Sequence, residues 1–470
     1  MGPFSQKQAD VVDVEKIAAA SDLEKTVSLG ENGSSDYIPD DGAVHAETFV
    51  LGDSWYAKTQ RLAGKFGVEQ RGIERVPSDE RSPAHISQVG TMWLSANMVV
   101  SSFAIGALAY PVFYLGFIDT VRQILARLNV LSLTYTTDLD HLLRQLTWYN
   151  SRVLLQHFWT PFWIETNGAF KVFLRSKSIC LKDRLSKANS SKYYGVKIVA
   201  CFNILACIGW SAVNVIVGAQ LFHAVNGNMP GWAGIIVIAA ATFLITLFGY
   251  KIVHTYERYS WIPCFIIFLI VLGEFVHSGM FYNVPMGVGK SEAGAALSFA
   301  ASVFGFATGW TSYAADYTVY QPVGRSRKSV FLWTFAGLIF PLLFTEMLGA
   351  AIATTMASND GSNVYMTGYE SSGIGGLLAA VIVPPLGRFG QFCLVVLALS
   401  IIANNCPNIY SVSLSLQLLA KVSQRVPRFI WTFVGTLIYC AIAIPGYGHF
   451  ESVLENFMLL IAYWLAIYEG

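Results

Sequence analysis

Long apolar runs constrain this chain more than any other feature of its sequence. Spanning a bilayer needs about 20 apolar residues, and nine segments reach or approach that length. Only 13% of the residues are charged, against roughly 25% in ordinary soluble domains. The sequence therefore predicts an all-α polytopic membrane protein. The nine expected spans are 93–118, 196–222, 231–250, 259–279, 293–315, 329–355, 388–419, 428–446 and 453–468.

Basic residues between these spans predict their orientation, because Lys and Arg concentrate in cytoplasmic connections. The connections at 251–258, 320–328 and 420–428 carry Lys and Arg, whereas HAVNGNM, ASNDGSNVYMTGYESSG and GYGHFES carry none. The first three should lie in the cytosol and the others outside. Residues 1–90 are polar and show no signal-peptide pattern, so we expect a cytosolic, largely disordered tail before a transmembrane domain at 91–470.

One stretch does not fit this topology. A cytosolic tail requires one more crossing between about 119 and 175, yet no 18-residue window there is compatible with lipid. Either a poor helix crosses the membrane here, or residues 121–192 are foreign to the fold, as an altered splice or shifted frame would produce. We favour the second explanation. The interrupting charges are Arg122, Arg127, Asp138, Asp140, Arg144 and Arg152.

Composition also excludes several classes of function. The formal net charge of +1 leaves no basic excess to neutralise phosphates, which argues against nucleic acid as a partner. The seven cysteines show no metal-site or disulfide spacing, so no metal site is expected. No nucleophile with a base and no phosphate loop occurs in the spans, so we expect no enzyme.

Two of the spans contain helix-breaking residues. SSFAIGALAYP carries Gly106 and Pro111, and FGFATGW carries Gly305 and Gly309. Transporters built from inverted repeats bind substrate at mid-membrane between two discontinuous helices at matching positions. Close helix packing is the alternative, because small residues enrich membrane helix interfaces. The polar residues described next favour discontinuous helices.

An indole and an amide share one helical face in GWSAVN, where Trp210 and Asn214 stand four apart. Such a pair suits a flat heteroaromatic ring, which stacks on the indole and hydrogen-bonds to the amide. Trp310 follows the expected break at Gly309 and offers a second stacking face. Packing or interface anchoring is the alternative for each Trp alone.

The run IIANNCPNIYS, residues 401–411, places three asparagines and a proline inside an apolar segment. Amides are costly in hydrocarbon, and Pro407 leaves a carbonyl one turn earlier without its helical donor. Asn404 and Asn408 are again four apart, and an amide offers a donor and an acceptor to a nucleobase edge. Helix-to-helix hydrogen bonds, on average only about 0.6 kcal/mol in membranes, are the alternative. The whole set predicts a heterocycle site.

Five stretches carry a resemblance to a known family: MWLSANMVVSSFAIGALAYPVFYLGF, CIGWSAVNVIVGAQ, FGYKIVHTYERYSWIPCF, FATGWTSYAADYTVYQP and LALSIIANNCPNIYSVSLSLQ. On these the chain resembles the fungal purine-cytosine permeases of the nucleobase-cation-symport-1 family. The resemblance is close over 90–120 and 194–470 and loose over the tail. It implies a LeuT-like fold of five-plus-five inverted repeats, normally with twelve spans. A normal second helix, expected at 120–150, and the last two spans are missing here.

The resemblance also implies roles for individual residues. Trp210 and Trp310 would stack on the base, while Asn214 and Asn408 would read its edge. The neighbouring positions that the resemblance or the spacing adds to the site are Ser101 or Ser102, Asn404, Asn405, Pro407 and Gly309.

The coupling ion is expected to be a proton, with no other cofactor. Sodium-coupled relatives hold the ion partly with hydroxyls on the eighth helix, and the matching positions here are Ile402 and Ala403. A carboxyl inside a membrane is a functional candidate because its charged form is costly there. The candidates for carrying the proton are Glu274, Glu346 and Asp316.

Three hypotheses follow. The first is a proton symporter that imports cytosine and purines across the plasma membrane, with its N-terminus in the cytosol. The second keeps the fold but transports another heterocycle, such as a pyridoxine-like vitamin or allantoin. The third is a transport-defective product, because residues 121–192 replace the second helix. The oligomeric state is left open.

Overall fold

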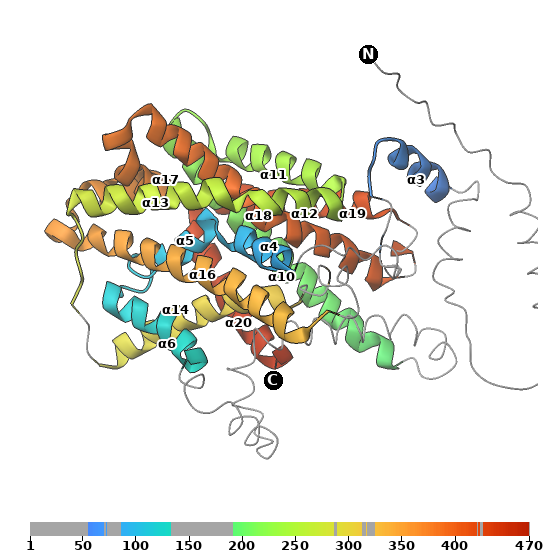
Figure 1. Cartoon of the computed structure of the whole chain (residues 1–470), viewed down its shortest axis with the longest axis horizontal. Coiled ribbons are helices and arrows are strands. Elements are labelled where there is room, and N and C mark those ends of the chain that lie inside the picture. The colour runs from blue at the N-terminus through green and yellow to red at the C-terminus, as the bar shows by residue number, and fades with distance from the viewer. Residues whose placement is uncertain are drawn as a thin grey trace, which may run out of the picture. The chain divides into compact units, whose positions relative to one another are not determined.

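The computed structural model describes residues 55–69, 72, 86–132, 191–285, 289–312, 316, 325–420, 422–423 and 426–469. Within these ranges the chain consists of α-helices, short 3-10 segments and turns (Figure 1). The first half of the helices comprises α3 (Trp55–Lys65), α4 (Ser87–Asn97), α5 (Val100–Ala107), α6 (Phe117–Ser132), α10 (Ser191–Val225), α11 (Gly231–Leu247), α12 (Tyr250–Tyr259) and α13 (Trp261–Ser278). The second half comprises α14 (Lys290–Thr308), η1 (Gly309–Ser312), α16 (Arg327–Thr354), η2 (Thr355–Gly361), α17 (Val364–Leu386), α18 (Arg388–Leu419), α19 (Arg428–Gly446), η4 (Tyr447–His449) and α20 (Phe450–Glu469).

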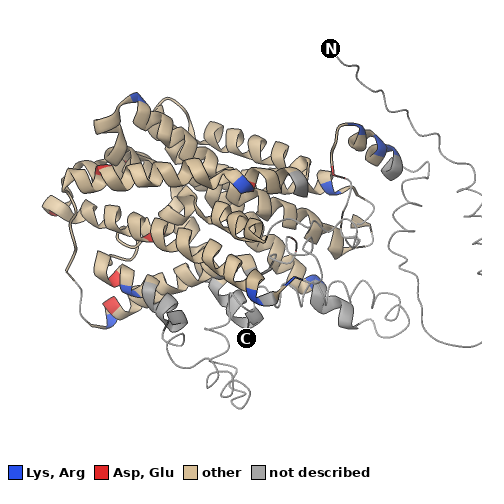
Figure 2. Cartoon of the chain, in the orientation of Figure 1, with Lys and Arg blue, Asp and Glu red and all other residues tan. Residues whose placement is uncertain are grey.

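The predicted membrane protein is confirmed. Six helical segments among the described residues are long and apolar enough to cross a membrane, or seven if the bent pair α4 and α5 counts as one span. In Figure 2 most of the helical ribbon is uncharged, and only a few Lys, Arg, Asp and Glu interrupt it. That distribution suits a chain whose middle lies in hydrocarbon, where ionised side chains are costly.

The packing of the helices shows the reciprocity of an inverted repeat. The long helices α10 and α18 pack on each other, and α11 packs on α19. Each member of one pair also contacts the other pair, since α10 reaches α19 and α11 reaches α18. Likewise α16 packs on the broken helix α4 and α5, while α6 packs on α14. The expected five-plus-five architecture is therefore present.

Two stretches expected to be connections contain helix. The basic connection expected at 251–258 is helical (α12). Only Phe248 and Gly249, the latter at φ +81°, separate α12 from α11. The other difference is α17, which begins inside the expected outer connection ASNDGSNVYMTGYESSG and continues through residues that no expected span covers. Ser372 and Gly373 leave helical geometry and kink α17, which as a whole is one of the six segments long and apolar enough to cross a membrane.

The place of the family's second helix is partly described. α6 is described over 16 residues, up to Ser132. It packs on α14 and α16. Residues 133–190 lie outside the described part of the chain, so the expectation of a foreign segment at 121–192 stays a prediction.

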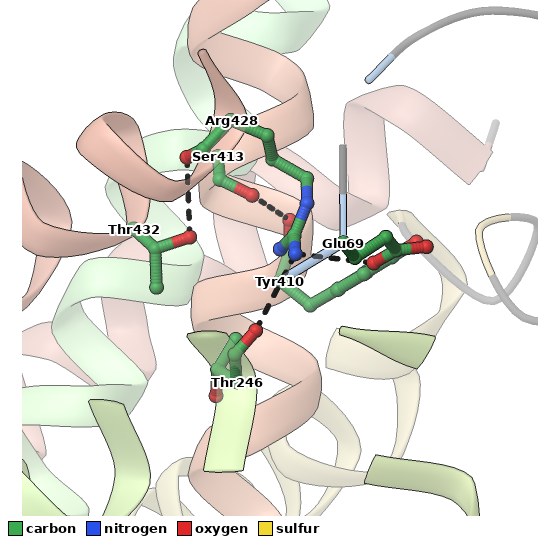
Figure 3. Close-up of polar contacts among 6 residues, drawn as sticks. All are labelled: Glu69, Thr246, Tyr410, Ser413, Arg428 and Thr432. Atoms are coloured by element: carbon green, nitrogen blue, oxygen red, sulfur yellow. Dashed lines mark hydrogen bonds and ion pairs between the residues drawn. The ribbon is translucent and has the colours of Figure 1, made fainter. Parts of the chain in front are cut away.

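A buried ion pair ties the segment before α4 to the helical core (Figure 3). Arg428, the first residue of α19, has a fully buried side chain, and its Nη2 lies 3.1 Å from Oε2 of Glu69. The guanidinium also lies 4.9 Å from the ring centroid of Tyr410 on α18, and its Nη2 donates to the carbonyl of Thr246 on α11 at 3.5 Å. Glu69 itself fits against Gly249, where a Cβ would collide with its carboxylate. This contact joins α11, α18 and α19 to residue 69.

Candidate functional site

The first transmembrane helix is interrupted at Met98 and Val99. The axes of α4 and α5 differ by 54° across these two residues. Val99 is extended, at φ −133° and ψ 162°, which interrupts the helical geometry. The Oγ of Ser102 donates to the carbonyl of Asn97 at 2.7 Å and so satisfies part of the opened backbone. The expected discontinuous helix is present.

The break does not lie where the sequence predicts it. Gly106 is inside α5, and a Cβ there would collide with the backbone of Glu346 on α16. Gly106 therefore allows α5 and α16 to pack closely, which was the alternative explanation for the small residues of this span. Pro111 lies in the turn that follows α5. The predicted position of the break is wrong because a hydroxyl, rather than Gly or Pro, supports the opening.

The second expected break coincides with a change of helix type at Gly309. There α14 gives way to the 3-10 segment η1, whereas Gly305 stays within α14. A Cβ on Gly309 would lie 3.0 Å from Nε1 of Trp210. The absent side chain thus lets the indole of α10 approach the residue that precedes Trp310.

Three amides join α10 to α18. Nδ2 of Asn214 donates to Oδ1 of Asn404 at 2.6 Å and to Oδ1 of Asn405 at 2.8 Å. Nδ2 of Asn404 donates in turn to the carbonyl of Ala96 at 2.6 Å, in the last turn of α4. Nδ2 of Asn405 reaches the carbonyl of Ser211 at 3.4 Å. The amides predicted from the sequence therefore meet beside the break between α4 and α5.

The other two predicted residues of α18 lie one turn further on. Asn408 is fully buried, as Asn404 and Asn405 are. Pro407 lies inside α18, which continues as one helix through it. Pro407 removes one backbone donor without breaking the helix, so α18 is not opened as a discontinuous helix.

Both predicted indoles are buried next to this cluster. Nε1 of Trp310 donates to Oδ1 of Asn97 at 3.0 Å, and its ring meets that of Trp93 edge-on at a centroid distance of 5.5 Å. The ring of Trp210 meets Phe306 and Phe457 edge-on, each at 5.1 Å. Aromatic side chains of α4, α10, α14, η1 and α20 therefore lie around the amides.

Four buried polar atoms around the cluster have no hydrogen-bond partner within the described ranges. They offer an acceptor, two hydroxyls and a donor, and leaving such groups unmet costs about 1–3 kcal/mol each. A group of unmet polar atoms in one place suggests a ligand that meets them. The four are Asn214 Oδ1, Ser101 Oγ, Ser211 Oγ and Trp93 Nε1. Ser102 differs from Ser101 because its hydroxyl is already engaged.

Sequence reasoning missed Trp93, Asn97 and Ser211. The first two had a signal, since Trp93 and Asn97 stand four apart, as Trp210 and Asn214 do. Asn97 also donates from Nδ2 to the carbonyl of Trp93 at 2.9 Å. Ser211 had no comparable signal because serines are common in membrane helices.

The three candidate proton carriers lie in different places. Asp316 is buried and accepts at Oδ2 from Ser411 of α18 at 2.7 Å, and Ser411 accepts from Asn203 of α10 at 3.1 Å. Glu346 is buried on α16, and its Oε1 has no partner among the described side chains. Glu274 is half-buried near the end of α13. The structure brings only Asp316 to the helix that carries the amide cluster.

A fourth carboxyl was missed from the sequence. Glu257 falls in the stretch read as a cytoplasmic connection, and α12 instead buries it completely. Neither of its carboxyl oxygens has a hydrogen-bond partner in the described part of the chain.

The family model for permeases for cytosine/purines, uracil, thiamine and allantoin matches residues 190–470. The purine-cytosine permease fcyB of Emericella nidulans is 52% identical over 449 residues, which covers 96% of this chain and 80% of that protein. The purine-cytosine permease FCY2 of Saccharomyces cerevisiae is 36% identical, covering 98% of this chain and 80% of that protein.

A solved structure shares the fold at low identity. Mhp1, a nucleobase-cation-symport-1 family transporter in a closed conformation with bromovinylhydantoin bound, superposes with a TM-score of 0.53 at 12% identity. The match covers 82% of this chain and 76% of Mhp1. It supports the inverted-repeat architecture and, at this identity, nothing finer.

Proposed function

Because the chain belongs to the family of permeases for cytosine/purines, uracil, thiamine and allantoin, we propose that it is a proton symporter that imports cytosine and purine nucleobases. The protein is a multi-pass membrane permease. The proposal adds the substrate, the coupled ion and the place of action, which is the plasma membrane with residues 1–90 in the cytosol.

The observation that carries the proposal is the unmet acceptor of Asn214. Its Nδ2 donates to Asn404 and Asn405, while Oδ1 is buried without a partner in the described ranges. An exocyclic amino group of cytosine or adenine would supply the missing donor. The hydroxyls of Ser101 and Ser211 supply further hydrogen bonds to a base edge.

The indoles fit the same substrate. Trp210 and Trp310 flank the amides, and stacking on an aromatic ring contributes about 1–3 kcal/mol per base in nucleic-acid complexes. In the structure the side chains of the cluster hydrogen-bond to one another. A base that enters would exchange some of these contacts for its own, with Asn408 taking part from the next turn of α18.

Proton coupling is supported by the two positions of α18 that match the ion-binding hydroxyls of sodium-coupled relatives. Ile402 and Ala403 offer no side-chain oxygen. The carbonyl of Ala96, at the end of α4, is already occupied by the amide of Asn404. A carbonyl held by a neutral donor is a poorer cation ligand than an open one.

Uptake of radiolabelled cytosine into cells that lack their own cytosine permease tests the proposal. We expect saturable uptake that unlabelled adenine competes for, that a protonophore abolishes and that replacing sodium by choline leaves unchanged. No competition by adenine, or a requirement for sodium, would contradict it.

Substitution of the edge-reading amides separates the alternative substrates. Asn408→Ala and Asn214→Ala should each abolish cytosine uptake, whereas Asn456→Ala, an exposed amide on α20, should not. Preferential uptake of pyridoxine or allantoin by the unaltered chain would favour the second hypothesis.

A further inference from the structure

Glu257 lies on the face of α12 that packs against α4. His254 and Ser260 occupy the positions three residues before and after it, hence the same side of the helix. The Nε2 of His254 lies 3.0 Å from Oε1 of Gln88, and the hydroxyls of Ser260 and Ser95 hydrogen-bond to each other. Since Gln88 and Ser95 are both on α4, the carboxyl of Glu257 stands between two polar contacts that join α12 to this half-helix.

The carboxyl of Glu257 is buried, and no hydrogen bond from the described residues offsets the cost of its burial. Glu257 has no exposed surface, and neither oxygen has a hydrogen-bond donor among the residues that the structure describes. A carboxylate in such a place would pay the full cost of desolvation, so the group is stable there only with its proton.

Among the described residues, the helices around Glu257 bring no side chain that hydrogen-bonds to its carboxyl. α12 packs against α4, α11, α13 and α18, and α4 and α11 contain no titratable residue at all. α13 contributes the thiol of Cys264, with Glu274 and His277 at its far end. The titratable residues of α18 are Arg388 and Cys393 in its first two turns, Cys406 and Tyr410. On α12 itself the titratable neighbours are Lys251, His254, Tyr256, Arg258 and Tyr259, and no described side chain among them hydrogen-bonds to the carboxyl.

The adjoining half-helix carries part of the candidate site. Asn97 of α4 holds the indole of Trp310, and Ala96 accepts from Asn404. α12 begins at the connection that the positive-inside pattern assigns to the cytosol. The α4–α12 contact therefore adjoins the candidate site on one side and the stretch assigned to the cytosol on the other.

We propose that Glu257 carries the coupled proton. This inference rests on the proposed proton symport. With the proton bound, the neutral carboxyl permits α4 to pack on α12. When cytosolic water reaches the contact, the O–H bond of the carboxyl breaks, the proton passes to water and the electron pair stays on the carboxylate. The carboxylate disfavours re-closure of α4 on α12, and the site built on Asn97 and Ala96 opens with it.

Glu346 is the rival carboxyl, and its setting differs. It lies on α16, whose backbone at Glu346 fits tightly against Gly106 of α5. No hydrogen bond among those described links the Glu346 side chain to α4 or α5. Glu257 instead stands between two hydrogen-bonded pairs that must separate if α4 moves.

The test compares three neutral variants in cells that lack cytosine uptake. The variants are Glu257→Gln, Glu346→Gln and, as an exposed control on α17, Glu370→Gln. For each, we measure surface abundance, the ratio of internal to external radiolabelled cytosine over acid to neutral external pH, and counterflow in preloaded vesicles. We expect Glu257→Gln to keep counterflow but to lose accumulation above the external concentration and the dependence on external pH. Glu370→Gln should behave as the wild type.

Accumulation by Glu257→Gln that a protonophore still abolishes would overturn the inference, as would loss of coupling in Glu346→Gln alone. If Glu257→Gln does not reach the membrane, Glu257→Asp tests the inference in its place. Its shorter side chain moves the carboxyl, so the external pH of half-maximal uptake should shift. An unchanged midpoint overturns the inference. Failure of the wild type to accumulate cytosine, or indifference to the protonophore, would instead refute the proposed function itself.

Discussion

At the scale of single residues, two neighbouring hydroxyls give a clean test of the site. Ser102 donates to the carbonyl of Asn97 and supports the break, whereas the hydroxyl of Ser101 is buried and unmet in the described structure. Ser101→Ala should raise the KM for cytosine severalfold and leave thermal stability unchanged, because no protein group loses a partner. Ser102→Ala should lower the melting temperature instead, since it leaves a buried carbonyl unpaired. Uptake kinetics and melting of the solubilised protein check both.

A reversed pattern would place Ser102 rather than Ser101 against the substrate. Unchanged KM in both variants would mean that neither hydroxyl contacts the base.

Trp310 combines two separable roles. Its ring offers a stacking surface, and its Nε1 donates to the buried Oδ1 of Asn97 at 3.0 Å. Trp310→Phe keeps a ring but strands that acceptor, which should cost about 1–3 kcal/mol of stability. Trp310→Leu removes the ring as well and should abolish measurable uptake. Equal uptake by the Phe and Leu variants, at equal surface abundance, would argue against stacking.

The sequence pattern predicted which residue types come together, but not which of their polar atoms remain without a hydrogen-bond partner in the protein. The spacing of Trp210 and Asn214, and of Asn404 and Asn408, pointed to one helical face each, and the structure brings Asn214 to Asn404. Whether an amide is spent on a neighbour or left for a ligand depends on contacts between helices distant in sequence. Asn97 was missed for this reason, although its spacing from Trp93 repeats the pattern.

At the scale of helices, Gly106 shows what fixes α5 to α16. A methyl group there would collide with the backbone of Glu346, and overpacking in a close contact costs about 1–3 kcal/mol. Gly106→Ala should therefore lower the melting temperature and the surface abundance. Gly294→Ala in α14, where a Cβ meets nothing within 4 Å, is the matched control. Wild-type stability of Gly106→Ala would mean that α5 and α16 separate without cost.

The ion pair of Arg428 and Glu69 anchors the segment before α4 (Figure 3). Removing one partner of a buried pair typically costs about 3–5 kcal/mol, because the other charge is left uncompensated. Arg428→Met or Glu69→Gln alone should lower the melting temperature strongly. The double variant should recover part of the loss, and a purely additive double variant would show that the two side chains do not interact.

Helix boundaries were predicted well where hydropathy alone decides them. α18 matches its expected limits at 388–419, whereas α12 was read as a connection because its Lys, His, Glu and Arg outweighed its apolar face. α17 was missed because Gly373, Gly375 and Gly376 are typical of loops. In the structure these glycines serve a kink and close contacts with Gln220 and Gly368. Such contacts leave no local signal in the sequence.

At the scale of the whole molecule, the open question is the second helix of the first repeat. The family model begins at residue 190, the described part of α6 ends at Ser132, and the sequence between 133 and 175 contains several charges. The remaining helices of both repeats pack reciprocally, so the rest of the scaffold could accept an ordinary second helix. We therefore expect a chimera that carries the corresponding segment of fcyB in place of residues 119–190 to exceed the present chain in surface abundance and cytosine uptake. Radiolabelled uptake, normalised to surface protein, measures the difference. Equal normalised uptake by the two chains would show that the segment as it stands completes the repeat, and would exclude the transport-defective hypothesis.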